Sequence, residues 1–450
     1  MTLIAVIAGL SSIGIIAACA GRLHFYFLFL FLVSVCIFPK ALYVFGTPKS
    51  HAGITSSAPS IWTYSVVLII FAGYALVSRR DLVAKAWLPL VIVTVLFSMF
   101  IWDMTDLQIS GALHLLTATL ASGLGVYCFK RTPWIGGRRD LMLAVFLVAL
   151  LEFTVCVSQL FQFSVPFLNS FSVNDITAET TAGRIAGTTD HPGTLGKIVF
   201  LLIIVCLPSV ASSDLKTKVL SITSIVLLAT PLIFSEGRAN FIAVLILLIS
   251  WPFTSALVRA TGQGSSKRLL IGLSTALVGV ASFGIYAARF SEDPVGGPRE
   301  RLLDVALIQI PMRLWTGTGP NSYVEVVGSY DRLTSLGWPV HSAPLLAIAE
   351  LGIIGGICVL LPFFVLTWRA LHVRSLKGFG AESAVVWISA TPGFVIIGTT
   401  GWGLLGGAIF ILYAFVVGYF SESLRQKIQV SSVASGSASS STNLVNSSST

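Results

Sequence analysis

Arginines and histidines carry the chemistry that this sequence can offer. Arg184, Arg238 and His341 lie in or beside polar stretches that separate long apolar segments. A guanidinium group binds phosphate or carboxylate oxygens through paired N–H donors. A neutral imidazole can take a proton from a hydroxyl group. Together these residues predict an anion-binding site next to a site of proton transfer.

Arg238 is the most informative of these residues. It follows Ser235, Glu236 and Gly237 where an apolar segment begins, and either Ser235 or Glu236 suits a helix N-terminus. An arginine there opposes the helix macrodipole, at a cost of about 0.3 to 1 kcal/mol. A bound anion would reverse that balance, because backbone N–H groups and the guanidinium would both face it. The alternative is a side chain that extends to lipid headgroups.

The other candidates lie in two polar stretches, roughly 164–193 and 289–341. The first stretch holds Arg184 and His191, and each has a structural alternative: a solvated arginine, and a histidine that marks the end of a loop. The second stretch ends at His341, whose alternative is an interfacial polar residue. It also holds three further arginines that could pair with neighbouring acids or face lipid phosphate: Arg299, Arg301 and Arg313.

Two glutamates fall inside apolar segments. Glu350 is nine residues past His341, which places it roughly 13 Å deeper along a helix. A carboxylate at that depth costs about 2.5 kcal/mol or more unless it is paired or faces a cavity. Glu350 is therefore expected to brace an arginine. Glu350 and Glu152 could equally relay protons in a transporter.

Familiar cofactor motifs are missing from the sequence. It has no P-loop, dinucleotide fingerprint or GxSxG motif, and the single turn Gly317-Thr318-Gly319 does not make a phosphate cradle. Asp103 and Asp106 lack a third metal ligand, and the six cysteines lie in apolar runs without paired spacing. We expect no metal and no cofactor.

The composition predicts an all-α, polytopic membrane protein. Of 450 residues, 55% are hydrophobic and 10% charged, whereas soluble domains are about a quarter charged. The net charge of +9 reflects membrane topology rather than nucleic-acid binding. Apolar runs long enough to cross about 30 Å of hydrocarbon recur along the chain. The thirteen predicted spans are 2–20, 23–46, 61–78, 86–102, 108–129, 141–163, 194–212, 217–234, 239–257, 269–288, 342–368, 383–399 and 403–420.

The lysines and arginines predict the orientation. Alternate loops hold 18 of the 28, which places those loops in the cytoplasm. Eight of the other ten lie between residues 184 and 332, on the external side, where basic residues are disfavoured. The chain then divides into an N-terminal scaffold (1–163), a first external loop (164–193), central spans (194–288), a large external loop (289–341), C-terminal spans (342–420) and a tail (421–450).

Two further segments have a predicted local structure. Between Arg299 and Trp315, the spacing of Leu303 and Leu307 with Ile310 and Leu314 predicts a short amphipathic helix on the membrane surface. Pro311 should end or kink that helix. From about Ser431 the sequence is half serine and is predicted to be disordered.

The order of these motifs resembles the O-antigen ligase and polymerase family of bacterial envelope glycosyltransferases. The matching features, in chain order, are Arg184 with Gly187 and the turn at 190–193; Ser235 to Arg238 at a helix start; Pro311, Gly317, Gly319 and Tyr323; and His341 with Leu345, Glu350, Gly352 and Gly355.

The resemblance implies a GT-C-like membrane enzyme without metal or nucleotide. It would transfer a glycan from a polyprenyl diphosphate carrier to a hydroxyl of another glycan (polymerase) or of lipid A-core (ligase), outside the bacterial cytoplasmic membrane. A chain-length regulator protein is a further implied partner. By the same resemblance Arg184 and Arg238 would bind the diphosphate, His341 would be the base and Glu350 would support them. Substrate-binding residues would be Arg299, Arg301, Arg313, His191 and Tyr323.

Two alternatives remain open from the sequence. A secondary transporter of an anionic or lipid-linked sugar would place Glu152 and Glu350 at the bilayer midplane. A non-catalytic assembly partner would bind the lipid carrier without turnover. The grouping of arginines on one predicted side favours chemistry at that side.

Overall fold

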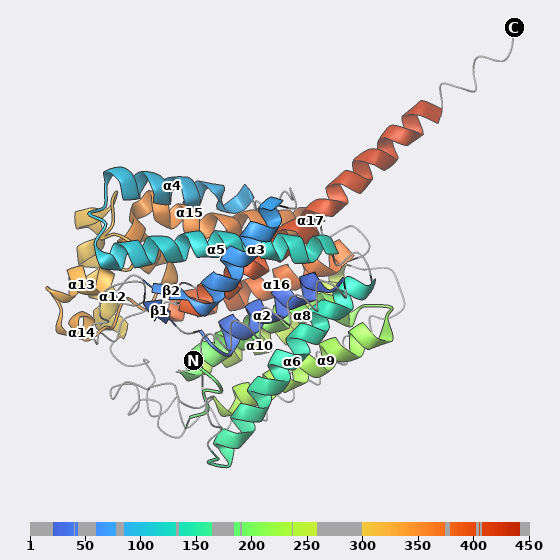
Figure 1. Ribbon diagram of the computed structural model, residues 1–450, viewed down its shortest axis with the longest axis horizontal. Helices are drawn as coiled ribbons and strands as arrows, with labels where there is room; N and C mark the ends of the chain where they lie inside the picture. The colour runs from blue at the N-terminus through green and yellow to red at the C-terminus, as the bar shows by residue number, and fades with distance from the viewer. Residues whose placement is uncertain are drawn as a thin grey trace, which may run out of the picture.

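The computed structural model describes residues 21–39, 41–43, 60–77, 85–131, 135–163, 184–189, 191–235, 237–258, 299–373, 379–401, 405 and 407–441. Within these residues the protein is all-α apart from one short hairpin (Figure 1). Eight described helices are long and apolar enough to cross a membrane, and three shorter apolar helices accompany them. The chain is a multi-pass membrane protein.

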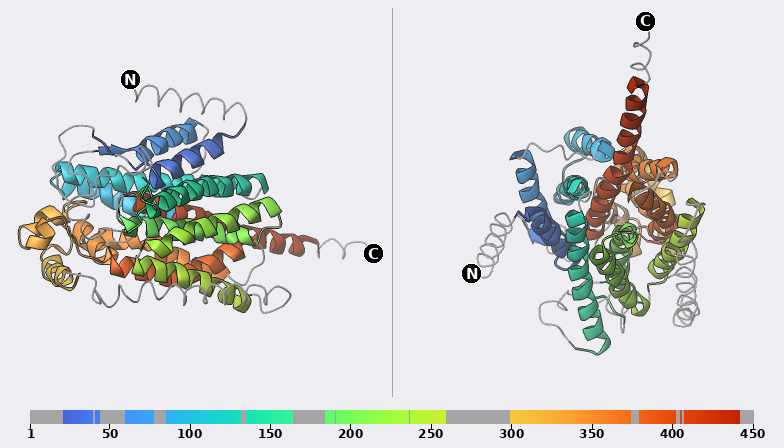
Figure 2. Two further views of the ribbon diagram at one scale, coloured as in Figure 1. Left: turned by 90° about the horizontal axis from the view of Figure 1, so that it is seen from below. Right: turned by 90° about the vertical axis from the view of Figure 1, so that its right-hand side faces the viewer.

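The helices pack side by side as a bundle, with short helices gathered at one end (Figures 1 and 2). In chain order the elements are α2 (Leu23–Cys36), β1 (Ala41–Tyr43), β2 (Ser60–Trp62), α3 (Thr63–Val77), η1 (Lys85–Trp87), α4 (Leu88–Phe100), α5 (Asp106–Arg131), α6 (Ile135–Leu160), α8 (Pro192–Val210), α9 (Leu215–Phe234), α10 (Arg238–Val258), α12 (Arg299–Gln309), η2 (Ile310–Arg313), α13 (Tyr323–Gly328), α14 (Arg332–Ser335), α15 (Ala343–Val373), α16 (Phe379–Thr400) and α17 (Gly407–Ser441).

The core of the bundle forms around α8 and the first part of α17, which are buried almost throughout. Glycines bring α5 and α17 into backbone contact: a side chain at Gly125 would overlap the Phe415 carbonyl, and one at Gly418 would overlap the Ser122 carbonyl. Such small residues are what helices in lipid use to approach closely. On α3, α4 and α9, by contrast, many large apolar side chains are exposed, as a lipid-facing surface requires.

Every predicted span that falls on described residues coincides with a helix. Two predicted spans, 2–20 and 269–288, lie outside the described residues. The predicted span 23–46 was too long, since α2 ends at Cys36 and β1 follows, pairing antiparallel with β2 through Leu42 and Ile61. Pro39 explains the early end, because it disfavours a helical residue before it and lacks an N–H donor.

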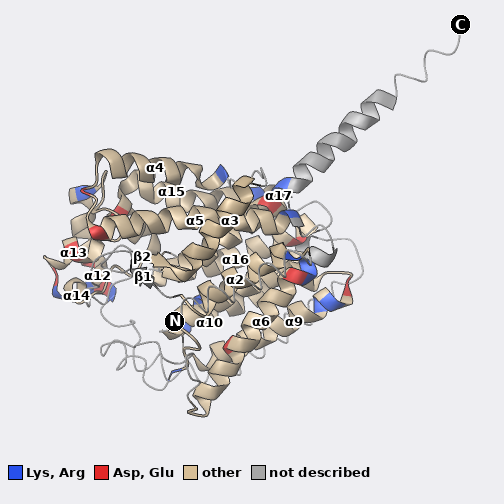
Figure 3. Ribbon diagram, viewed as in Figure 1, with Lys and Arg blue, Asp and Glu red and all other residues tan. Residues whose placement is uncertain are grey.

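Charged residues gather at both ends of the bundle (Figure 3). We call the end that carries α12, α13 and α14 the loop end; α17 leaves the body at the opposite end (Figure 2). α17 continues to Ser441, into the segment from Ser431 that the sequence predicts to be disordered, and disorder there stays a prediction. Extending an existing helix avoids the cost of nucleating one.

The large loop forms a small core of its own. From residue 299 onward it folds into α12, η2, α13 and α14, with a separate apolar cluster of Ala306, Tyr323, Val327, Val340, Leu346 and Ala349. A helix, α12, forms where the sequence predicts an amphipathic one. Its buried residues are Leu302, Ala306 and Gln309, while Leu303 and Leu307 are exposed.

Candidate anion-binding site

The loop before α8 is fixed to α6 by its backbone. Gln159 accepts the N–H of Ala186 at 3.2 Å and of Gly187 at 2.9 Å through Oε1, and donates from Nε2 to the Gly187 carbonyl at 2.7 Å. Gly187 has φ +64°, and a side chain there would overlap the Glu152 carboxyl group. This contact explains why the loop needs glycine at 187.

Glu152 completes the attachment of this loop. It is 1% exposed and accepts hydrogen bonds from the backbone N–H of Thr188 at 3.1 Å and from the Thr188 hydroxyl. The sequence left Glu152 open between structural and proton-relay roles. In the structure Glu152 has a structural role, because its hydrogen bonds from Thr188 hold the segment that carries Arg184 and His191.

The N-termini of α8 and α10 are joined by a side-chain hydrogen bond. His191 is the N-cap of α8, and its Nδ1 accepts the N–H of Gly193 at 2.9 Å. Asn240 of α10 donates from Nδ2 to the Gly193 carbonyl at 3.1 Å, and Gly196 leaves room for the Asn240 side chain. Two helix N-termini, each a site of partial positive charge, therefore lie next to each other.

Basic residues from four segments converge at this junction. Arg184 and Lys197 both lie close enough to the His191 imidazole to lower its pKa, as does His341. Arg299 and Lys197 act in the same way on His341. We call Arg184, His191, Lys197, Arg299 and His341 the basic cluster.

Arg238 borders the basic cluster through its backbone. It begins α10, three residues after Ser235, whose carbonyl accepts the Arg184 Nε–H at 3.1 Å. In the described part of the chain, Arg238 is not among the charges that act on either imidazole. The structure thus brings Arg184, His191, Arg299 and His341 together and places Arg238 at their edge.

Both histidines of the basic cluster are neutral near pH 7. Burial lowers the pKa of His191 to about 4, with Lys197 and Arg184 adding charge repulsion. Burial likewise lowers the pKa of His341 to about 4; Arg299 adds to the shift, while the Pro339 carbonyl opposes it. Neutral imidazoles have one donor nitrogen and one acceptor nitrogen.

The hydrogen bonds assign opposite tautomers to the two rings. His341 Nδ1 lies 3.0 Å from the Pro339 carbonyl oxygen, which can only accept, so Nδ1 carries the proton and Nε2 is an acceptor. His191 Nδ1 accepts from Gly193, so its Nε2 carries the proton. Trp338 stacks on His341, with ring centroids 6.0 Å apart. One ring can therefore donate a hydrogen bond and the other can take a proton.

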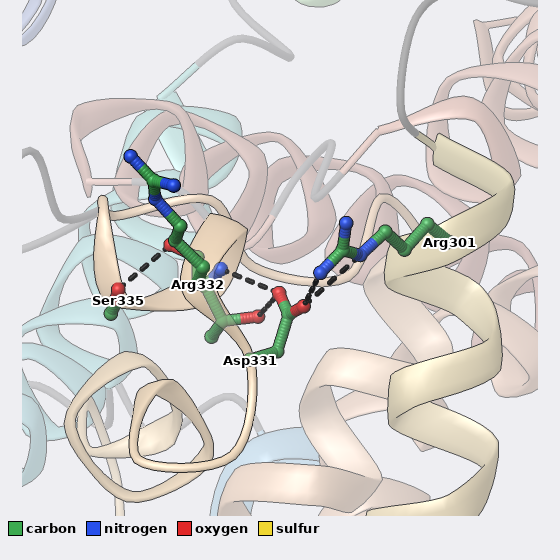
Figure 4. Close-up of polar contacts among 5 residues, drawn as sticks. Arg301, Asp331, Arg332 and Ser335 are labelled. Carbon is green, nitrogen blue, oxygen red and sulfur yellow. Dashed lines mark hydrogen bonds and ion pairs between the residues drawn. The ribbon is translucent and has the colours of Figure 1, made fainter.

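Arg301, predicted to bind substrate, is paired within the protein. Its Nε and Nη2 donate to Asp331 Oδ1 at 3.2 and 2.8 Å, while Asp331 Oδ2 accepts the Thr334 N–H at 2.8 Å (Figure 4). The Asp331 side chain is 4% exposed. Arg301 therefore ties α12 to α14. This contact also explains why an arginine stands in the first turn of α12.

Tyr323 and Glu350 differ from their predicted roles. Tyr323 is 1% exposed inside the small core of the loop, which removes it from any substrate at the surface. The Glu350 carboxyl group accepts the backbone N–H groups of Asn321 and Tyr323. Among the described contacts, Glu350 therefore braces a loop backbone and not an arginine.

The glycine-rich turn directs its N–H groups into the protein. Gly317, Thr318 and Gly319 donate to the carbonyls of Arg313, Ala349 and Glu350 at 2.8 to 2.9 Å. Two side chains donate to carbonyls at this turn. Trp102, between α4 and α5, donates to the Thr316 carbonyl at 3.1 Å, and Gln108 of α5 donates to the Thr318 carbonyl at 3.2 Å. Because these donors are used, the turn offers no phosphate cradle.

A break in α15 receives the glycine-rich turn. Gly352 has φ +69°, and a side chain there would overlap the Trp315 carbonyl. The helix carbonyls exposed by this break are those that the turn binds. Arg313 lies at the end of η2 just before the turn, and its charge is not among those acting on either imidazole in the described residues.

Lys197 is the cluster residue that sequence reasoning did not select. It lies in the second turn of α8, within an otherwise apolar span. An ionisable residue inside a span is costly and usually functional, which is the signal that could have identified it. Among the described residues no group of three or more His, Cys, Asp or Glu side chains could hold a metal ion.

A search of protein-family models finds no match to this chain, and a search of curated proteins finds none either.

Proposed function

We propose that this protein is a membrane glycosyltransferase that passes a glycan from a polyprenyl diphosphate carrier to an acceptor hydroxyl. The observation that supports this most is the convergence of Arg184, Lys197 and Arg299 on two neutral imidazoles. Cations gathered around a pair of neutral imidazoles favour a bound anion. A polyprenyl diphosphate would present such an anion at the membrane, because its diphosphate group is attached to a lipid chain.

The leaving group gains negative charge as the sugar departs. Arg184 and Lys197 stabilise that charge, and His191 donates its Nε2–H to a phosphate oxygen. Charges fixed in advance at a partly buried site stabilise a transition state more than mobile water does. The adjoining N-termini of α8 and α10 contribute in the same direction.

His341 takes the proton of the acceptor hydroxyl. The new bond joins the acceptor oxygen to the anomeric carbon, the bond from that carbon to the phosphate oxygen breaks, and the proton moves to His341 Nε2. A pKa of about 4 makes His341 a weak base in the empty site. A bound diphosphate raises that pKa, because its negative charge offsets Arg299 and Lys197.

The order of motifs along the chain supports the same proposal, since it resembles the O-antigen ligase and polymerase family. The active side is then the outer side of a bacterial cytoplasmic membrane, and the acceptor is either another lipid-linked glycan or lipid A-core. Deletion separates these two: loss of all long chains on lipid A indicates a ligase, and survival of single-repeat forms indicates a polymerase.

The test is glycan transfer from a purified lipid-linked glycan by the protein in lipid nanodiscs. Arg184→Ala, Arg238→Ala and His341→Gln should each lose most of the transfer rate. The matched control is Arg332→Ala, since Arg332 is an exposed arginine of α14 at the same end. Full activity of Arg238→Ala at normal expression would refute its assignment.

The transporter alternative has less support. It requires Glu152 and Glu350 as proton carriers, whereas both accept hydrogen bonds that hold loops in place. Counterflow uptake of a sugar phosphate into proteoliposomes, without glycan transfer, would favour transport and contradict the enzyme.

A further inference from the structure

A small, partly open cavity lies between helices of the bundle and shares no residue with the basic cluster. It has a volume of about 50 Å³ and is bounded by α5, α15, α17 and the end of the glycine-rich turn. Most of its lining is apolar, including Leu115 and Phe410. Its polar members are His114, Asn321 and Glu350.

His114 is the feature that needs an explanation. It is 9% exposed, and within the described residues neither ring nitrogen has a hydrogen bond of good geometry. Its ring packs against Tyr64 and Phe410, with centroids 6.4 and 5.7 Å away. The Gly407 backbone lies near and satisfies one nitrogen at most. Buried polar groups in native proteins almost always have a partner, from the protein or from ordered water.

Glu350, which also lines the cavity, can accept further hydrogen bonds. The Glu350 carboxyl group already accepts from the N–H groups of Asn321 and Tyr323. A carboxyl group has about four lone-pair sites when ionised, so it can accept further hydrogen bonds. The cavity volume also exceeds the roughly 10 to 15 Å³ that one water molecule requires.

We propose that this cavity is a hydration site, in which at least one water molecule bridges the buried His114 ring and the Glu350 carboxyl group. The ligand must be of water size and must both donate and accept hydrogen bonds. Such a molecule satisfies the imidazole. It also gives Glu350, which holds the glycine-rich turn on α15, an exchangeable hydrogen-bond partner inside the membrane span.

The first test is a high-resolution density map of the full-length protein in lipid nanodiscs. The expected result is solvent density within hydrogen-bond distance of a His114 ring nitrogen. A cavity without density would overturn the proposal, and so would a His114 side chain with both nitrogens bonded directly to protein atoms.

Thermal unfolding of matched variants is a second, independent test. Tyr64→Phe removes a buried hydroxyl that also lacks a partner among the described residues but does not line the cavity. It should leave the Tm unchanged or raise it. His114→Leu should lower the Tm, because it removes one partner of the bridging water, and His114→Asn should recover part of the loss. A rise in Tm for His114→Leu would show that no water molecule binds the His114 ring, and it would overturn the proposal. If His114→Leu does not fold, the density map decides.

Discussion

Two polar segments at the loop end use their polar atoms differently. In the glycine-rich turn, backbone N–H groups and carbonyls bind α15, Trp102 and Gln108. In the loop before α8, Gln159 and Glu152 hold the backbone, while the neutral His191 imidazole lies near Arg184 and near Lys197 and His341 of other segments. The first segment is thus docked by its own backbone groups, and the second is held in place by side chains of α6.

The largest expected effect concerns docking. Gly352→Ala would force a side chain into the Trp315 carbonyl at a position with φ +69°. We expect a loss of about 3 kcal/mol or more in unfolding free energy, read as a large fall in Tm or as loss of expression. The control is Gly398→Ala in α16, where no atom lies within 4 Å of the new methyl group. Equal Tm values for the two variants would contradict the docking role.

The second expected effect concerns the basic cluster. Lys197→Met keeps the length of the side chain and removes its charge. It should reduce glycan transfer by roughly 10- to 100-fold, the equivalent of one hydrogen bond to a charged group, with little change in Tm. Lys216→Met is the control, since Lys216 is an exposed lysine in the first turn of α9. Equal activity of the two variants would remove Lys197 from the site.

A smaller effect is expected at the Arg301–Asp331 pair. Burial raises the pKa of Asp331, but hydrogen bonds from Thr334 and Arg301 lower it to a net value below its ordinary one. The resulting stability is present above the ordinary aspartate pKa and is lost as pH falls through the lowered one. Arg301→Gln should cost about 0.2 to 1 kcal/mol of stability, since the arginine is 61% exposed. Its glycan transfer should stay normal, so a transfer rate as low as that of Lys197→Met would return Arg301 to the substrate site.

The smallest expected effect is a pH dependence of donor binding. Each phosphate of a diphosphate-linked glycan carries one ester bond and one anhydride bond, which leaves a single strongly acidic proton, so both keep their charge across this range. Their charge should raise the pKa of His191 and His341 above the value of about 4 in the empty site. Donor affinity should therefore rise severalfold as pH falls from 7.5 to 5.5, measured by titration calorimetry. A flat profile would contradict direct contact, and His191→Gln with His341→Gln should flatten it.

The fold could be predicted to a large extent because hydrophobic length is a strong signal. Spans such as 108–129 and 217–234 fall on α5 and α9 with small shifts at their ends. The hairpin of β1 and β2 could not be foreseen, since its strands are three residues long and lie 16 residues apart.

The site could be predicted only in part, because sequence shows charge but not pairing. Arg184, His191 and His341 were selected, and the structure brings them together. In the sequence Arg301 looks equivalent to the other arginines of the large loop. In the structure it is paired with Asp331, which lies 30 residues later in the chain. Tyr323 was selected only through the family resemblance, and the structure buries it in the small core of the large loop. Long-range contacts decide which polar residues remain at a surface.

The most direct test of the basic cluster is a structure of the protein in nanodiscs with bound polyprenyl diphosphate. We expect phosphate oxygens within hydrogen-bond distance of the Arg184 guanidinium, the Lys197 ammonium group and His191 Nε2. Diphosphate density elsewhere, with these three side chains bound only to protein atoms, would contradict the assignment of the cluster as the diphosphate site.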